Sequence, residues 1–230
     1  MASGGRTLTS TGRRRMTTEA QILTLAQWFS PAYPIGAFAY SHGLETAIKD
    51  RRIATANDLE SWLSDVIEHG SGRNDCILLH AAYHCEDEAA LADVDAAASA
   101  FAGSAERLKE TRLQGTAFAK TTAAIWSGEA PDCANPVAVG YAARRLGLPV
   151  ELTAAMYLQA FASNLVSAAV RLVPLGQTEG QATLTALSPL CLEVAQNTEP
   201  ADIDELHSTA FLSDIAAMAH ETLEHRIFRS

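Results

Sequence analysis

The sequence lacks any run of eighteen or more apolar residues, so it predicts no helix that crosses a membrane. Its four cysteines form no close-spaced framework, which in a chain of this size favours free thiols in a reducing cytoplasm. Basic residues are too few to balance the acids: the formal net charge is −10 at pH 7, and nucleic acid would need a basic face. We therefore expect a cytoplasmic protein that binds neither membrane nor nucleic acid, and whose partners offer a basic surface or a cation.

Convincing strand patterns are missing as well. No stretch alternates apolar and polar residues with a period of two, whereas helical spacing recurs through most of the chain. The sequence therefore predicts an all-α fold, a single-domain bundle of about ten helices over residues 18–225. Residues 1–17, rich in Ser, Thr, Gly and Arg, are predicted to be a disordered basic tail, and residues 226–230 a short C-terminal tail.

Capping residues and helix breakers predict where the helices begin and end. Thr18, Ser104 and either Thr55 or Asn57 are predicted N-caps, because their side-chain oxygens can accept from the first free N–H groups. The most apolar long segment, residues 151–172, is predicted to be the central core helix. The expected helices occupy about residues 18–29, 38–49, 56–69, 75–85, 88–102, 105–126, 136–146, 151–172 and 179–195, with one or two more ending near residue 224.

Residues 28–45 form the least ordinary stretch of the chain. They hold five aromatic residues, two prolines and two glycines, and they carry no charged side chain before Glu45. Pro31 and Pro34 exclude a helix, so residues 30–36 are predicted to form a fixed loop. A charge-free aromatic loop is either a packed corner between helices or a surface covered by a partner, and the residues alone favour the packed corner.

The pentapeptide Ala-Tyr-Ser-His-Gly at residues 39–43 imitates the nucleophile elbow of serine hydrolases, with alanine in place of the first glycine. That motif needs a strand before the serine, so that a strained turn exposes the hydroxyl. Here a proline loop precedes the serine and helical spacing surrounds it. A hydrolase acting through Ser41 is therefore the disfavoured alternative, and Ser41 and His42 are interpreted as helix-surface or packing residues.

Cys76, His80 and His84 are spaced by four residues, so a helix would place them on one face. Thiolate and imidazole ligands suit nickel, zinc or copper, which makes a nickel-carrying protein a second alternative. A fourth ligand would have to come from elsewhere in the chain, and histidines on an alanine-rich helix are more often hydrogen-bonded or exposed. No GxxxxGK[ST] run is present, so the chain itself is not expected to bind a nucleotide through a P-loop.

Three further stretches point to a family. Residues 30–45 read SPAYPIGAFAYSHGLE, residues 171–177 read RLVPLGQ, and His-Glu-Thr at 220–222 is followed by RIFRS at 226–230. In this order and spread over nearly the whole chain, they closely resemble the two signatures and the C-terminus of the UreF family of urease accessory proteins.

The resemblance implies a function. UreF-like proteins are helical cytoplasmic accessory factors, not enzymes, for the insertion of nickel into urease. They assemble with the accessory protein UreD, called UreH in some organisms, and recruit the GTPase UreG to the urease apoprotein. For this chain the resemblance therefore implies a homodimer within such a complex and no firmly bound cofactor. Nickel would pass through the complex, and GTP would be bound by UreG.

The resemblance also implies partner-binding residues, taken position by position from the three stretches: Tyr40, Glu45, Arg171, Gln177, Arg226, Phe228 and Arg229. The chain departs from the family pattern at Leu223–His225, where Gln-Tyr-Ser is frequent, and at Ala219, where arginine is common. The tail itself is expected to make few contacts with the bundle and to bury Phe228 against a partner.

Overall fold

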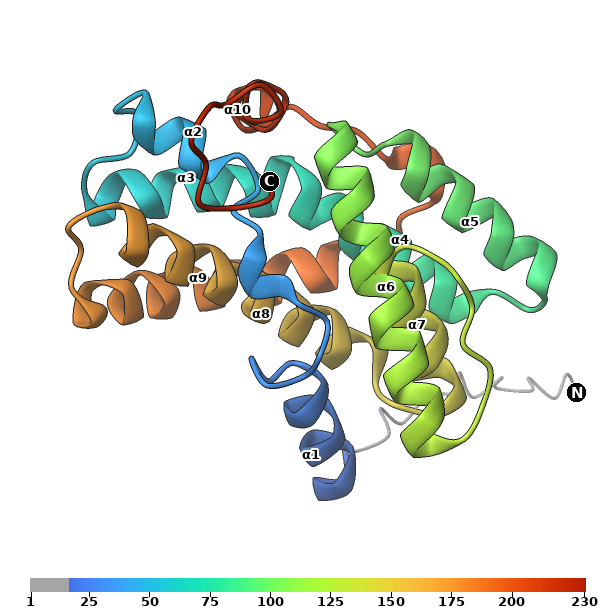
Figure 1. Cartoon of the computed structure of the whole chain (residues 1–230). Helices are drawn as coiled ribbons and strands as arrows, with labels where there is room; N and C mark the ends of the chain where they lie inside the picture. The colour runs from blue at the N-terminus through green and yellow to red at the C-terminus, as the bar shows by residue number, and fades with distance from the viewer. Residues whose placement is uncertain (1–16) are drawn as a thin grey trace, which may run out of the picture.

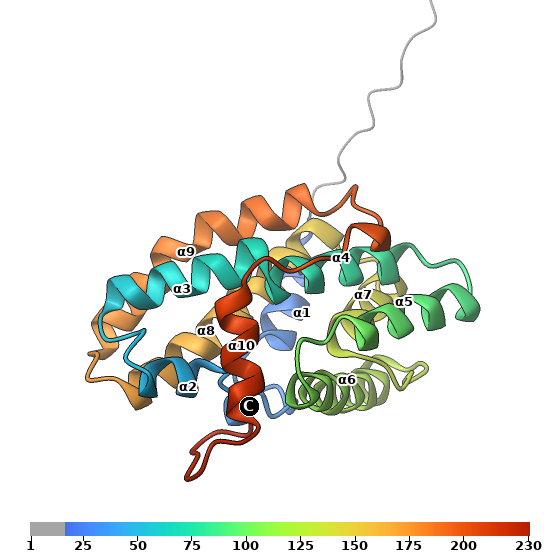
Figure 2. The same cartoon turned by 90° about the horizontal axis from the view of Figure 1, so that it is seen from above.

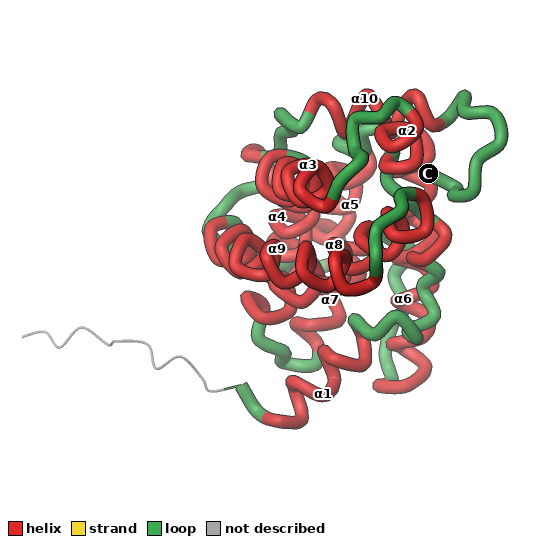
Figure 3. Tube along the Cα trace, turned by 90° about the vertical axis from the view of Figure 1, so that its left-hand side faces the viewer, coloured by secondary structure: helices red, strands yellow, loops and turns green. Residues whose placement is uncertain are grey.

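The computed structural model describes residues 17–230, and all regular structure in that range is helical, so the predicted all-α fold is confirmed. Figure 3 shows helices joined by loops, without a strand in the described part. Nearly all of the predicted basic tail, residues 1–16, lies outside the described residues. The elements are α1 (Glu19–Trp28), η1 (Ala37–Ala39), α2 (Leu44–Lys49), α3 (Ala56–His69), α4 (Ser71–His84), α5 (Glu88–Ala100), α6 (Ala105–Trp126), α7 (Asn135–Arg145), α8 (Val150–Leu172), α9 (Gln177–Asn197), η2 (Ile203–Glu205) and α10 (Phe211–His220).

Local capping chemistry sets several of these boundaries as the sequence predicts. Thr18 and Thr55 each accept a hydrogen bond from the third residue of the following helix, and both form complete capping boxes. Ser104 caps α6 by accepting from the N–H of Arg107 at 3.0 Å. The predictions for α1, α3 and α6 therefore hold because their signals lie within one helical turn.

Helix α8 occupies the middle of the bundle, as predicted for the most apolar segment (Figure 1). It contacts α9 along its length and also touches α1, α2, α3, α4 and α7. Leu158 and Leu165 are buried at its centre. Because α8 touches elements from both halves of the chain, a residue at its end can lie close to segments far away in sequence.

The predicted helix over residues 38–49 is wrong. The structure has the 3₁₀ turn η1, an irregular stretch and only then α2, which begins at Leu44. Gly36, His42 and Gly43 have positive φ angles of 75°, 58° and 75°, a region that α-helical residues do not occupy. Residues 40–43 are therefore not helical, and they lie beside the C-terminal end of the chain.

Three further predictions need correction. Helix α4 begins at Ser71 rather than Asp75, so Asp75 lies inside the helix and is buried. Helix α9 begins at Gln177, because the Glu179 carboxylate accepts from the N–H of Gly176 at 2.8 Å and caps the helix earlier than predicted. In α1, helical spacing predicts a buried stripe of Ile22, Leu25, Ala26 and Phe29, but Ile22 is 46% exposed and Trp28 is buried.

Helix α10 crosses the bundle beside α2 and α6, and the chain after it turns outward and then back (Figure 2). The C-terminal residue thus lies against the body of the molecule, near α2 and α10. Among residues 17–230, no helix combines the length and the apolar character that a membrane span requires.

Candidate functional site

The structure brings together the three stretches that resemble family signatures, although up to about 190 residues separate the segments. The N–H of Ser41 donates to the Ser230 backbone oxygen at 2.7 Å, and the N–H of Arg229 donates to the Ala39 carbonyl at 2.8 Å. These two bonds lay residues 226–230, here called the C-terminal tail, along the irregular stretch before α2. Arg171, at the end of α8, borders the same place.

Glu45 anchors the C-terminal tail. It lies in the first turn of α2, is only 7% exposed, and its carboxylate accepts from the N–H of Ile227 at 2.8 Å and of Phe228 at 2.9 Å. Hydrogen bonds to an ionised carboxylate are the stronger kind, and here they satisfy two backbone donors that the tail could not satisfy by itself. The role of Glu45 is therefore to hold the tail in place.

Phe228 is the apolar anchor of the tail and is 3% exposed. The guanidinium carbon of Arg171 lies 4.5 Å from the centroid of the Phe228 ring, within the range of a cation–π contact. The Arg171 Nη2 also donates to the carbonyl of Phe38 at 3.2 Å. Arg171 thus joins the end of α8 to the tail and to η1 at the same time.

Most of the predicted site residues meet here, and one does not. Tyr40 is buried beside the tail, and its carbonyl accepts from Nδ2 of Asn164 at 3.3 Å. Arg226 forms an ion pair with Glu106 of α6. Gln177 is exposed at the first residue of α9, and no hydrogen bond within residues 17–230 joins it to this cluster.

The expectation that the tail makes few contacts with the bundle is wrong. Phe228 and Ser230 are both buried against the protein's own chain. The acceptors from α6, Glu106 and Glu110, were not foreseen: Glu106 pairs with Arg226, and Glu110 accepts from the Ser230 hydroxyl at 3.0 Å. The sequence did hold one signal, since two carboxylates four residues apart share one helix face.

Buried charges continue from the tail into the molecule. Arg107 lies 3.4 Å from Glu110 and donates to the Asp75 carboxylate at 2.6 Å, which also accepts from the Tyr157 hydroxyl at 2.6 Å. Burial raises the pKa of Glu110, but Arg107, His42 and a hydrogen bond from Ser230 lower it by more, so the net pKa lies below the ordinary value. Glu110 is therefore a charged acceptor for the tail.

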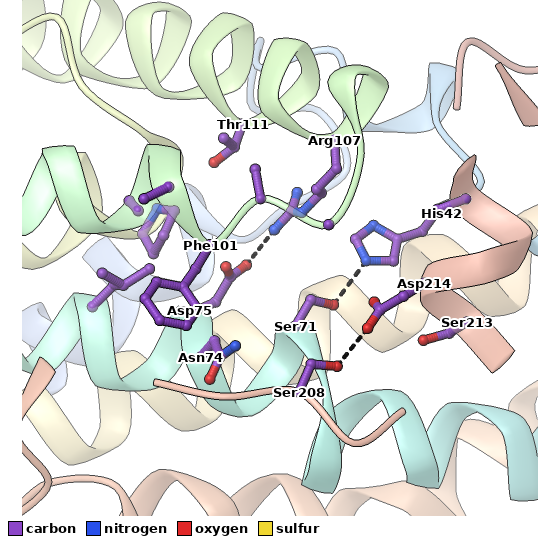
Figure 4. A pocket seen from close by; sticks show the side chains of 17 residues that line it. His42, Ser71, Asn74, Asp75, Phe101, Arg107, Thr111, Ser208, Ser213 and Asp214 are labelled. Atoms are coloured by element: carbon purple, nitrogen blue, oxygen red, sulfur yellow. Dashed lines mark hydrogen bonds and ion pairs between the residues drawn. The ribbon is translucent and has the colours of Figure 1, made fainter. Parts of the chain in front are cut away.

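A cavity of about 270 Å³ lies beside this network, between α4, α6 and α10 (Figure 4). In Figure 4 the Arg107–Asp75 pair and the His42 ring face it from opposite sides. His42 Nε2 lies 2.7 Å from the Ser71 hydroxyl, and Ser208 donates to Asp214 at 2.6 Å on a third side. Most of these polar groups already bond to one another within the chain, so we interpret them as structural contacts that hold the helices together.

Comparison with known proteins gives the family. Residues 53–188 match the family model for UreF. The chain belongs to the UreF family. It is 52% identical to the urease accessory protein UreF of Ruegeria pomeroyi over 93% of this chain and 98% of the relative, and 53% identical to that of Roseobacter denitrificans over 96% and 98%. A Cereibacter sphaeroides urease accessory protein UreF is 54% identical over 92% of this chain and 99% of the relative. A UreF protein is an accessory protein and not an enzyme.

The geometry of Ser41 does not fit the nucleophile of a serine hydrolase. The side chain is fully buried, and its hydroxyl donates to the backbone oxygen of Ser230. A 3₁₀ turn precedes it, not a strand, so the exposed hydroxyl of a nucleophile elbow is not formed. The interpretation of Ser41 as a packing residue is confirmed, although it lies in a loop and not on a helix.

The nickel-carrier alternative also gains no support from this UreF structure. Cys76 and His80 are buried and His84 is exposed, and His80 Nε2 bonds to the Ala195 carbonyl at 3.0 Å. Burial, together with nearby Asp75, raises the pKa of Cys76 well above its ordinary value, which disfavours the thiolate. No group of three or more possible metal ligands gathers anywhere in the described range.

Proposed function

We propose that this UreF protein acts in urease maturation as an adaptor, and that the surface around the C-terminal tail is where a partner docks. The partners would be a UreD or UreH protein and the GTPase UreG, acting together on the urease apoprotein in the cytoplasm. The names of its relatives, urease accessory protein UreF, support the urease role. The sequence resemblance to UreF motifs supports the partners.

One observation carries the location of the docking surface. A hollow of about 480 Å³ borders the tail and is lined by Tyr40, Glu106, Lys109, Leu113 and residues 226–229. Ile227 is 70% exposed there, and Lys109 and Arg229 are exposed as well. Two cations, Lys109 and Arg229, and the apolar Ile227 are thus exposed side by side in a chain of net charge −10. Because Glu45 holds the backbone of the tail, this contact surface is ordered.

Nickel and GTP enter this proposal through the complex. We propose that the chain holds neither firmly, that nickel passes through the assembled complex as cargo, and that UreG binds the GTP. The protein would be a homodimer within the complex. Cys76 and His80 are both buried, and His80 Nε2 bonds to the Ala195 carbonyl, which is compatible with this division of labour.

The test separates binding from folding by changing only side chains that point outward. Arg229→Glu and Ile227→Ser keep the backbone bonds of the tail to Ala39 and Glu45, so the melting temperature should stay within about 2 °C of the original. Each variant should lose complex formation with UreD-like or UreG-like partners in size-exclusion chromatography. Urease activity in cells that supply the urease operon should fall at least tenfold.

Lys120→Glu is the matched control, since it makes the same charge change at an exposed position further along α6. It should leave both the complex and urease activity unchanged. An intact complex with both tail variants would show that the docking surface lies elsewhere. Full urease activity without the gene for this chain would overturn the function itself.

A further inference from the structure

His220 is fully buried, and both of its ring nitrogens face carboxylates. Its Nδ1 lies 2.7 Å from Glu106 Oε2, and its Nε2 lies 3.4 Å from Glu45 Oε2. The residue is the last of α10, which Figure 2 shows crossing beside α2 and α6. It therefore connects three helices through two acidic side chains.

The chemistry of imidazole makes this geometry depend on protonation. A neutral ring carries one N–H, so its other nitrogen presents a lone pair. With carboxylates at both nitrogens, that lone pair would face a negative oxygen, whereas a ring with two N–H groups donates to both. The carbonyls at the C-terminal end of α10 also favour a cation at this position.

The two carboxylates that His220 contacts are the same two that hold the C-terminal tail. Glu45 accepts from the N–H groups of Ile227 and Phe228, and Glu106 pairs with Arg226. The charged groups around the ring are thus Glu45 from α2, Glu106 from α6 and, through Glu106, Arg226 from the tail. Just past α10, the Glu221 carboxylate points to the start of α6, where it accepts from the N–H of Ala105 at 2.8 Å.

We propose that His220 is a proton-dependent latch: the doubly protonated ring positions Glu45 and Glu106 to hold the tail, and loss of one proton releases it. A lone pair against either carboxylate drives that side chain away from its position. Glu45 then loses its alignment with the two tail N–H groups, or Glu106 its pairing with Arg226. The inference concerns docking of the tail on its own chain and does not depend on which partner binds.

The sign of the effect follows from linkage. The docked state binds the additional proton, so the ratio of docked to undocked tail falls as pH rises, by up to tenfold per pH unit for one linked proton. The full-length chain with 4-fluorophenylalanine at position 228 can report this ratio. The fluorine resonance distinguishes a buried ring from a solvent-exposed one, and the spectrum is recorded from pH 6 to pH 9.

We expect the docked resonance to dominate at pH 6 and to lose population with rising pH. In His220→Gln, which keeps one donor and one acceptor but cannot titrate, the ratio should stay constant over the same range. His225→Gln, at an exposed position in the turn before the tail, should behave as the unmodified chain does. A docked fraction that does not change with pH in the unmodified chain, or changes equally in His220→Gln, would overturn the latch.

A second measurement covers the case in which His220→Gln does not fold. Nitrogen-15 labelling of the histidine rings reports whether each nitrogen carries a proton. At pH 6 we expect both nitrogens of His220 to be protonated, and the second proton to be lost over the same pH range as the docked fluorine resonance. A neutral His220 ring at pH 6 with the tail docked would refute the proposal.

Discussion

Three residues with left-handed backbone bring the stretch before α2 to the C-terminal tail. Gly36, His42 and Gly43 all have φ between 58° and 75°, and these turns replace the helix that spacing alone predicts. The two glycines differ in their surroundings. A Cβ on Gly36 would meet no atom within 4 Å, whereas a Cβ on Gly43 would lie 2.5 Å from the backbone nitrogen of Ala217 in α10.

The two glycines make a matched pair for mutation. Gly36→Ala should lower the free energy of unfolding by about 1–2 kcal/mol, because only the left-handed backbone conformation is penalised. Gly43→Ala should cost roughly 1–3 kcal/mol more, because the new methyl group also has to displace the backbone of α10. Urea denaturation of both variants checks the order, and equal losses would mean that α10 moves aside freely.

At the scale of elements, the C-terminal tail is part of the fold. Phe228 is buried, and the buried carboxylates of Glu45 and Glu110 accept hydrogen bonds from the tail. Burying the phenylalanine ring contributes about 2 kcal/mol, and leaving a buried carboxylate without its donors costs about 1–3 kcal/mol. Helix α10 and the irregular stretch before α2 therefore depend on the tail for part of their order.

Deleting Arg226–Ser230 should accordingly destabilise the protein by about 3 kcal/mol, lowering the melting temperature by roughly 6–12 °C. Phe228→Ala should cost nearly as much, because a tail without its anchor leaves its site and the loss cannot exceed the free energy of docking. Ile227→Ala is the control, since that side chain is exposed. Differential scanning calorimetry measures all three, and an unchanged melting temperature after the deletion would show that the tail contributes nothing to the fold.

At the scale of the whole molecule, two buried polar groups illustrate opposite ways of tolerating burial. Arg107 keeps its charge because Asp75 and Glu110 surround it. For His80 burial dominates: together with the nearby His84 it lowers the pKa from 6.5, although the Ala195 carbonyl and Glu151 oppose part of that shift. The folded protein therefore holds His80 neutral in the core between α4 and α9.

This burial predicts a loss of stability in mild acid. Between the lowered pKa of folded His80 and 6.5, the unfolded chain binds more protons than the folded chain does. The stability that depends on neutral His80 is therefore complete above pH 6.5 and is lost as pH falls toward the folded pKa. From pH 7.5 to pH 5.5, the free energy of unfolding of the unmodified chain should fall by up to about 1 kcal/mol more than that of His80→Gln.

Urea midpoints at the two pH values measure the effect. The exposed His69→Gln is the control and should keep the original pH dependence. The proposed latch at His220 has the opposite sign, but it is common to all three proteins and cancels in the comparison. An identical pH dependence in His80→Gln and the unmodified chain would contradict the prediction.

The sequence by itself determined the helical class, most helix boundaries and the central position of α8. The signals for these features are local: Thr18, Thr55 and Ser104 cap their helices through bonds to residues three positions away. Burial of α8 likewise follows from its apolar composition, which needs no knowledge of a partner. The amino-acid sequences of three separate stretches also indicated the family without any knowledge of the structure.

Only the tertiary structure decided that those stretches form one site. The bonds that join them link Glu45 to residues 227 and 228 and Ser41 to Ser230, across more than 180 positions. No local pattern encodes such a pairing, because it depends on α10 and α6 being held beside α2 by the packed core. The same packing buries Phe228 within its own chain. The apolar ring is removed from water there, and the backbone N–H groups of the tail have acceptors within the chain.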